Sequence, residues 1–232
     1  MENNIILSSK INIDKYTEYV CEKFDLQNRE ENTTIIPMLN RDELNTFDWN
    51  IGLICGNSGS GKSTILNLLG EVKTYSFDNS KSVVSQFENL SEEEVVDLLQ
   101  SLSLSSVPVW LNKPNELSNG ERARLDICYH LSKANEGDII LIDEYSSTVN
   151  RSSAKSMSYA LQRYIRKKNL KIILASCHFD IIEWLNPDWI FNLNKQNDNK
   201  CEIERLIYSD DKEYQTYNMV NPNNVLSKKY DI

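Results

Sequence analysis

The feature that most constrains the fold is a glycine-rich loop directly after a short apolar run. Residues 49–56 read WNIGLICG and residues 56–63 read GNSGSGKS, which fits the pattern Gly-x-x-x-x-Gly-Lys-Ser. Glycines let such a loop wrap with its backbone N–H groups pointing inward at an anion. A helix predicted over residues 62–69 adds the positive end of its dipole. We therefore expect a strand, a phosphate-binding loop and a helix in succession.

Each residue type in this loop has a chemical task. Lys62 neutralises charge on the β- and γ-phosphates, and the Ser63 hydroxyl is a ligand for Mg²⁺. The residues expected to bind the nucleotide here are Gly56, Asn57, Ser58, Gly59, Ser60, Gly61, Lys62, Ser63 and Thr64.

A second candidate site follows a continuous apolar run. Residues 138–143 read DIILID, which is typical of a strand covered on both faces, and Glu144 comes next. Ligands of open α/β sheets lie at the carboxyl ends of the strands. Asp143 there can hold Mg²⁺, and Glu144 can polarise an attacking water as a general base.

Apolar runs alternate with helical patterns along most of the chain, which predicts an α/β fold with a largely parallel sheet. Strands are expected at 49–56, 138–143, 171–176, 189–193 and 201–208, and helices at 14–24, 62–69, 91–102, 118–131, 153–168 and 180–185. In the first helix, Tyr16, Tyr19, Val20 and Phe24 recur at helical spacing, which favours a packed face over a binding site. We divide the chain into an N-terminal segment (1–48), a main domain (49–208) and a tail (209–232).

Composition excludes several classes of protein. The formal charge of −9 argues against a generally basic, nucleic-acid-coating surface. The five cysteines are scattered and never form Cys-x-x-Cys, so neither a disulfide scaffold nor a cysteine-rich zinc module is expected. Residues 1–16 show no signal-peptide pattern, and no apolar run is long enough to insert into a membrane. The expected compartment is the cytoplasm.

Between the two motifs lies Leu117-Ser118-Asn119-Gly120-Glu121. This order of motifs resembles the nucleotide-binding domain of ABC-type ATPases, whose signature reads LSGGQ. The resemblance implies a P-loop NTPase fold of the ABC ATPase type, with a mostly parallel core sheet and a short helical subdomain. It also implies ATP and Mg²⁺ as cofactors and an ATP-dependent homodimer with two nucleotides at its interface.

The resemblance implies a role for individual residues. Gln86, in VVSQF, matches the glutamine that touches Mg²⁺ and the attacking water. Asp143 matches the metal-binding aspartate, Glu144 the catalytic glutamate, and His178, in LASCHFD, the histidine that contacts the γ-phosphate. The signature residues Ser118, Asn119 and Gly120 would bind the γ-phosphate of a nucleotide held by the opposite subunit.

The chain departs from the family pattern at several positions. Asn119 and Glu121 replace a glycine and a glutamine of the signature. Asn150 replaces the aspartate of the D-loop (residues 147–150), and Tyr145 replaces the proline that usually follows the glutamate. Phe24 and Trp49 both stay open as the aromatic residue that stacks on adenine.

A narrower likeness covers residues 49–195. The strings WNIGLICGNSGSGKST, VPVWLNKPNELSNGE, LIDEYSSTVNR and SCHFDIIEWLNPDWIF resemble a phage and bacterial group in which the ABC ATPase is often joined to a GNAT-type acetyltransferase domain. The resemblance implies that an acetyltransferase could be a separate partner. Trp184 and Trp189 in the last string are expected to pack in the core.

Three functions stay open. The first is an ABC ATPase that moves a non-membrane partner, linked to nucleic-acid modification or an acetyltransferase. The second is the ATP-binding subunit of a membrane transporter whose spanning subunits are separate chains. The third is an ATP-dependent dimer switch with little turnover. One basic cluster is a candidate for nucleic-acid contact, although a solvated helix end is the favoured interpretation. Its members are Arg163, Arg166, Lys167, Lys168 and Lys171.

Overall fold

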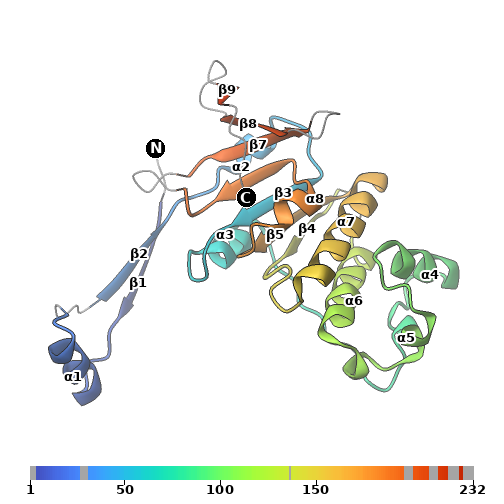
Figure 1. The fold of residues 1–232 in the computed structure, drawn as a ribbon, viewed down its shortest axis with the longest axis horizontal. Helices are drawn as coiled ribbons and strands as arrows, with labels where there is room; N and C mark the ends of the chain where they lie inside the picture. Colours follow the sequence, from blue (N-terminus) through green and yellow to red (C-terminus); the bar gives the residue numbers. More distant parts are fainter. Residues whose placement is uncertain are drawn as a thin grey trace.

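A mixed sheet of seven strands forms the centre of the molecule, in the order β4-β5-β3-β6-β7-β8-β9. The computed structural model describes residues 4–26, 31–135, 137–195, 201–208, 214–218 and 225–226. Figure 1 shows helices beside this sheet and a hairpin arm that projects away from it. Within the sheet, β4, β5, β3 and β6 are parallel, and β7, β8 and β9 are added antiparallel.

The elements alternate as the apolar pattern predicts. The strands are β1 (Ile5–Lys10), β2 (Glu31–Ile36), β3 (Ile51–Cys55), β4 (Ile139–Ile142), β5 (Lys171–Ser176), β6 (Trp189–Asn192), β7 (Ile203–Tyr208), β8 (Tyr214–Asn218) and β9 (Val225–Leu226). The α-helices are α1 (Lys15–Lys23), α2 (Arg41–Leu44), α3 (Lys62–Leu69), α4 (Glu92–Ser101), α5 (Val107–Leu111), α6 (Asn119–Ser132), α7 (Arg151–Lys167) and α8 (Ile181–Leu185). Two short 3₁₀ turns cover Val84–Gln86 and Pro114–Glu116.

Strand β3 is buried on both faces, because its side chains alternate between two apolar clusters. Ile51, Leu53 and Cys55 pack in the cluster that contains residues of α4, α6, α7 and α8. Ile54 faces the other cluster, in which α3 covers the sheet. A strand covered on both faces reads as a continuous apolar run, and this confirms the predicted α/β fold with a largely parallel core.

Local signals explain the helix boundaries. Ser91 caps α4 and Ser118 caps α6, and each forms a capping box with the glutamate three residues later. The predicted helix over residues 62–69 coincides with α3. Strands β1 and β2 lie in the segment where only one helix was expected.

The N-terminal segment forms an arm. Strands β1 and β2 pair antiparallel, from Ile5 opposite Ile36 to Lys10 opposite Glu31, and α1 sits between them at the far end (Figure 1). Helix α1 has no buried residue.

The expected packed face on α1 is wrong. Its apolar side chains are largely exposed, because the arm holds the helix away from the sheet and no other described element covers it. They are Tyr16 (69% exposed), Tyr19 (59%), Val20 (44%) and Phe24 (64%). Helical spacing identifies an amphipathic helix and does not reveal whether another surface covers it.

The two tryptophans of residues 184–191 pack in the core, as expected. Trp189 is fully buried and Trp184 is 9% exposed. A Cβ added to Gly52 would lie 2.0 Å from the ring of Trp189, so a glycine in β3 makes room for this indole in β6. The packing brings the two strands into close parallel contact.

Asp188, just before β6, ties three elements together. Its Oδ2 accepts hydrogen bonds from the backbone N–H groups of Asn50 and Ile51, both at 2.8 Å. Its Oδ1 accepts from Arg166 Nη1 of α7 at 2.9 Å, and Arg166 Nη2 also donates to the carbonyl of Asn186. The carboxylate therefore joins the start of β3 to α7.

We expect Asp188→Asn to lower the free energy of unfolding by about 2 kcal/mol, because an amide cannot accept from all three donors. Urea unfolding monitored by circular dichroism measures this effect. Lys167→Ala, an exposed position on the same helix end, serves as the control and should stay within about 0.5 kcal/mol of the parent. Equal midpoints for Asp188→Asn and the parent would contradict the role of this carboxylate.

Candidate active site

The predicted site residues follow parallel strands and meet at one edge of the sheet. Cys55, the last residue of β3, is opposite Ser176, the last residue of β5. Ile142, the last residue of β4, is opposite Leu174. The phosphate loop, the Asp143–Glu144 pair and His178 therefore emerge from neighbouring strands at the same edge, where ligands of open α/β sheets lie.

The phosphate loop adopts a conformation that requires glycine. Gly59 has a φ of 78° and Gly61 a φ of 95°, both in the left-handed region. A Cβ on Gly61 would also lie 2.5 Å from the Ile36 side chain at the base of the arm. Helix α3 begins next, and no side chain caps its N-terminus, so its first N–H groups can serve an anion.

Two side chains in the loop suit a nucleotide phosphate. Lys62 Nζ lies along the loop and donates to the carbonyls of Gly56 (2.9 Å) and Asn57 (2.7 Å). The Ser60 hydroxyl is buried and has no hydrogen-bond partner in the part of the chain that the structure describes. A buried hydroxyl without a partner is costly, and a phosphate oxygen would satisfy it. These observations fit the polyphosphate of ATP.

The metal position is consistent with Mg²⁺ bound jointly by protein and nucleotide. Ser63 is exposed in the first turn of α3, and Asp143 is half-buried at the end of β4. No group of three His, Cys, Asp or Glu side chains that could hold a metal occurs among the described residues. Magnesium sites of nucleotide enzymes usually combine one or two protein ligands with phosphate oxygens and water.

Asn194 is a site residue that the sequence did not reveal. Its Oδ1 accepts from the backbone N–H of Asn57 and its Nδ2 donates to Asn57 Oδ1, both at 3.0 Å. Its own N–H donates to Asn192 Oδ1 at 3.0 Å. The segment after β6 therefore holds the phosphate loop from the side. No motif in the sequence marks this contact, because it joins residues 137 positions apart.

The two acidic residues after β4 differ in setting. Asp143 Oδ1 accepts from the backbone N–H of Glu144 at 2.8 Å, which fixes its side chain. Glu144 is exposed and has a φ of 48°, an uncommon value for a residue with a side chain. Next comes Tyr145, which is buried where the family pattern has a proline.

The Gln86 side chain is buried and occupied within its own loop. Its Oε1 accepts from the N–H of Asp78 at 3.0 Å. Its Nε2 donates to the carbonyls of Asp78, Lys81 and Ser82, at 2.9, 3.3 and 3.1 Å. A role of Gln86 at Mg²⁺ stays a prediction, and these hydrogen bonds would have to break for the side chain to reach the metal.

His178 is half-buried, and its backbone N–H donates to Ser176 Oγ at 3.1 Å. Two residues later, Asp180 Oδ2 accepts from Arg151 Nε at 2.7 Å. The Arg151 guanidinium also lies over the ring of Trp184, 5.4 Å from its centroid. The segment after β5 is therefore tied to the start of α7.

The signature segment lies at the start of α6. The Ser118 hydroxyl and backbone N–H both donate to Glu121 Oε2, at 2.6 and 2.9 Å. These bonds lower the pKa of Glu121. Arg124 donates to the carbonyl of Gly120 at 3.0 Å and to Ser156 Oγ of α7 at 2.8 Å. The donors expected to bind a phosphate in a second subunit are thus held by the chain's own carboxylate.

Comparison with known proteins decides the family. A profile described as the Rad17 P-loop domain matches residues 13–192. The chain belongs to this P-loop family. Its solved neighbours include the dimeric ATP-binding cassette MJ0796 bound to ADP and Pi, with a TM-score of 0.54, 15% identity, and 77% of this chain and 93% of that chain covered. The fold is that of an ABC ATPase cassette, and the chain is a P-loop ATPase that uses ATP and Mg²⁺.

The curated proteins to which this P-loop ATPase is similar include ATP-binding proteins of transport systems. ThiQ of Histophilus somni, a thiamine import ATP-binding protein, is 27% identical over 172 residues, which cover 56% of this chain and 79% of the relative. LolD of Ehrlichia chaffeensis, of a lipoprotein-releasing system, is 23% identical over 197 residues, with 64% and 81% covered. MacB of Aggregatibacter actinomycetemcomitans, a macrolide export ATP-binding/permease protein, is 26% identical over 166 residues. The match spans only 25% of that protein's length.

Of the two aromatic candidates for stacking on adenine, Trp49 is packed in the core. Trp49 is 5% exposed and packs edge-on against Trp189, with ring centroids 5.6 Å apart. Its indole N–H donates to the carbonyl of Leu44 at 2.9 Å. The Trp49 ring is therefore not free to stack on a base. Phe24 lies at the exposed end of the arm.

The basic cluster at the end of α7 is partly structural. Arg166 is bound to Asp188, and Lys171 Nζ lies 5.1 Å from the ring centroid of Trp49. Arg163, Lys167 and Lys168 stay exposed. Among the described residues, no helix of this P-loop ATPase has the length and apolar character that a membrane span requires.

A cavity of about 320 Å³ lies beside Glu144. Asp143 and Glu144 form part of its wall, and Asp126 and His130 of α6 form another part. Burial raises the pKa of Asp126 and lowers the pKa of His130, and Lys73 lowers the latter further. The cavity is large enough to hold water next to Glu144.

We expect Ser60→Ala to weaken ATP binding about tenfold, or about 1.4 kcal/mol, without lowering the stability of the nucleotide-free protein. The hydroxyl has no hydrogen-bond partner among the described residues, so we expect its removal to cost little until a phosphate is bound. Titration with a fluorescent ATP analogue and thermal unfolding without nucleotide measure the two effects. Unchanged affinity, or a large loss of stability, would contradict the assignment of this hydroxyl to the phosphate.

Proposed function

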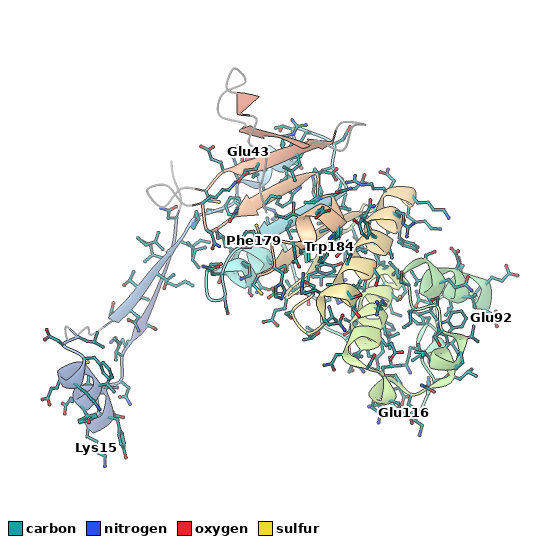
Figure 2. The ribbon with its side chains drawn as sticks, in the orientation of Figure 1. Lys15, Glu43, Glu92, Glu116, Phe179 and Trp184 are labelled. Carbon is teal, nitrogen blue, oxygen red and sulfur yellow. The ribbon has the colours of Figure 1, made fainter. Side chains whose placement is uncertain are left out.

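We propose that the chain works as a head-to-tail homodimer that closes around two Mg²⁺-ATP molecules, hydrolyses them and reopens. One observation carries this proposal. The phosphate loop, Glu144 and His178 share one sheet edge, whereas the signature begins α6 in the helical group. Glu116, just before the signature, lies at the lower end of the group formed by α4, α5 and α6, apart from α3 in the view of Figures 1 and 2. One copy therefore holds half of each complete site.

Each group has a role in this reaction. The loop N–H groups and Lys62 hold the phosphates, and Ser63 and Asp143 would hold Mg²⁺, which neutralises charge between the β- and γ-phosphates. Glu144 orients the attacking water and accepts its proton. Ser118, Asn119 and Gly120 of the second copy would contact the γ-phosphate, so that closure depends on ATP and opening follows hydrolysis.

The first candidate partner is a non-membrane component, such as a nucleic-acid-modifying protein or an acetyltransferase. The four strings between residues 49 and 191 support this candidate, through their likeness to a phage and bacterial group of ATPases. The cytoplasm is the compartment we propose, supported by the five free cysteines.

A second candidate is the ATP-binding subunit of a membrane transporter. A specific observation favours it, because ThiQ and LolD are named as ATP-binding proteins of import and lipoprotein-releasing systems. In that case the spanning subunits would be separate chains, and the cassette would transmit closure to them.

We expect Glu144→Gln to abolish turnover and to accumulate as an ATP-bound dimer, because the amide cannot accept the proton of the attacking water. Lys62→Ala should lose ATP binding and stay monomeric. Size-exclusion chromatography with light scattering, with ATP and with ADP, measures the dimer, and phosphate release measures turnover. A Glu144→Gln protein that hydrolyses ATP at the parent rate would overturn the proposal.

The partner is tested by steady-state phosphate release with and without duplex DNA. Stimulation by DNA that disappears in Glu144→Gln supports the first candidate. Glu144→Gln trapped with ATP should instead co-sediment with membranes of the source cell under the second candidate. The ADP-bound protein serves as the control in both experiments, because it should stay open.

A further inference from the structure

Ser176 connects the two catalytic segments through one hydroxyl group. It is the last residue of β5 and is fully buried. Its Oγ donates to the carbonyl of Tyr145 at 2.8 Å and accepts from the backbone N–H of His178 at 3.1 Å. One partner is the residue directly after Glu144, and the other is His178 itself. A hydroxyl is suited to this position because it donates and accepts at once.

The Tyr145 peptide is held on both sides. Its N–H donates to the carbonyl of Ala175 at 2.8 Å, and its carbonyl accepts from Ser176. Its ring is buried, and its hydroxyl is 2.9 Å from Ser158 Oγ of α7. Burial raises the pKa of the Tyr145 phenol, so the group stays protonated and able to donate. The backbone N–H and the backbone carbonyl of Tyr145 thus both form hydrogen bonds with β5.

The backbone on either side of Tyr145 is in a costly conformation. Glu144 has a φ of 48° and Ser146 a φ of 66°, both in the left-handed region. Residues with side chains stay in this region only where their surroundings over-determine it. Within the turn, the Glu144 N–H donates to Asp143 Oδ1 at 2.8 Å and the Ser147 N–H donates to the Glu144 carbonyl at 3.0 Å. The contacts of Tyr145 with Ala175, Ser176 and Ser158 add the anchors that tie this turn to β5 and α7, and so help to set the direction in which the Glu144 side chain leaves the backbone.

We propose that Ser176 is a positioning residue that fixes Glu144 and His178 relative to each other. The inference rests on the proposed function of these two residues in ATP hydrolysis. Ser176 itself is fully buried, so it would act through these two segments and not by contact with the nucleotide. Its removal leaves the Tyr145 carbonyl and the His178 N–H without their shared partner and frees both segments to shift separately. Small misplacements of reacting groups can reduce rates by about 100-fold.

The test is a double-mutant cycle on the full chain. Ser176→Ala should lower kcat by about 10- to 100-fold while the Kd for a fluorescent ATP analogue changes by about twofold or less. His178→Ala should then cost much less in the Ser176→Ala background than in the parent, because the histidine is already misplaced. A merely structural residue would not show this loss of the His178 effect.

Ser158→Ala is the matched control. It removes a fully buried hydroxyl that also contacts Tyr145, whereas the hydrogen bonds of the described residues include none between Ser158 and His178. In the double variant, the fold-change in kcat should equal the product of the fold-changes of Ser158→Ala and His178→Ala, as expected for independent residues. If Ser176→Ala does not fold, Ser176→Cys replaces it, since a thiol of similar size is a weaker donor and acceptor.

The outcomes separate this inference from the proposed function. A parent-like kcat for Ser176→Ala overturns the positioning role, and so do effects of Ser176→Ala and His178→Ala on kcat that simply multiply. In either case an inactive Glu144→Gln leaves the proposed function intact. A Glu144→Gln protein with parent-like turnover overturns the proposed function instead. Strong coupling between Ser176 and His178, with no such coupling for Ser158, supports the inference.

Discussion

Strand β3 lies between β5 and β6, and the rest of the site depends on this parallel alignment. The alignment requires glycine at position 52, because the Trp189 ring occupies the space where a side chain would be. Asp188 then fixes the beginning of β3 through the N–H groups of Asn50 and Ile51. A shift of one residue would exchange the two faces of the strand and move the phosphate loop away from Asp143 and Glu144. The positions of the site residues therefore depend on the register in which β3 pairs with β5 and β6.

The loops at the sheet edge are held by different means. Asn194 holds the phosphate loop through two side-chain hydrogen bonds to Asn57. The loop after β4 is held by its own buried tyrosine, where the related pattern has a proline. A proline restricts its own φ, whereas Tyr145 relies on packing and on hydrogen bonds to β5. The conformation of the loop that carries Glu144 therefore depends on the tertiary structure more than on the local sequence.

The extent to which the sequence predicts the structure follows from the range of each interaction. Local sequence determines the phosphate loop, the strands and the caps at Ser91 and Ser118, because each depends on neighbours a few residues away. These elements can therefore be predicted from the sequence. The contacts of Asn194 and Ser176 cross between strands and have no sequence signature. The sequence does not predict the arm, because β1 and β2 are mostly exposed and lack the alternation of apolar and polar residues that marks a half-buried strand. The roles of Gln86 and the signature residues stay predictions, since each depends on a nucleotide or a second copy.

One substitution in the signature would affect the energetics of closure in the proposed dimer. Glu121 stands where the related pattern has a glutamine, and its carboxylate receives both donors of Ser118. This carboxylate is ionised at neutral pH, and the hydrogen bonds from Ser118 lower its pKa further, so in the proposed dimer a γ-phosphate held by the second copy would meet a negative charge at the helix N-terminus. For the phosphate to take over the Ser118 donors, the carboxylate must rotate away and be solvated. In the proposed dimer, this exchange would oppose part of the free energy of ATP-dependent closure, so the closed state would be weaker, and more easily reopened, than one formed around a neutral glutamine.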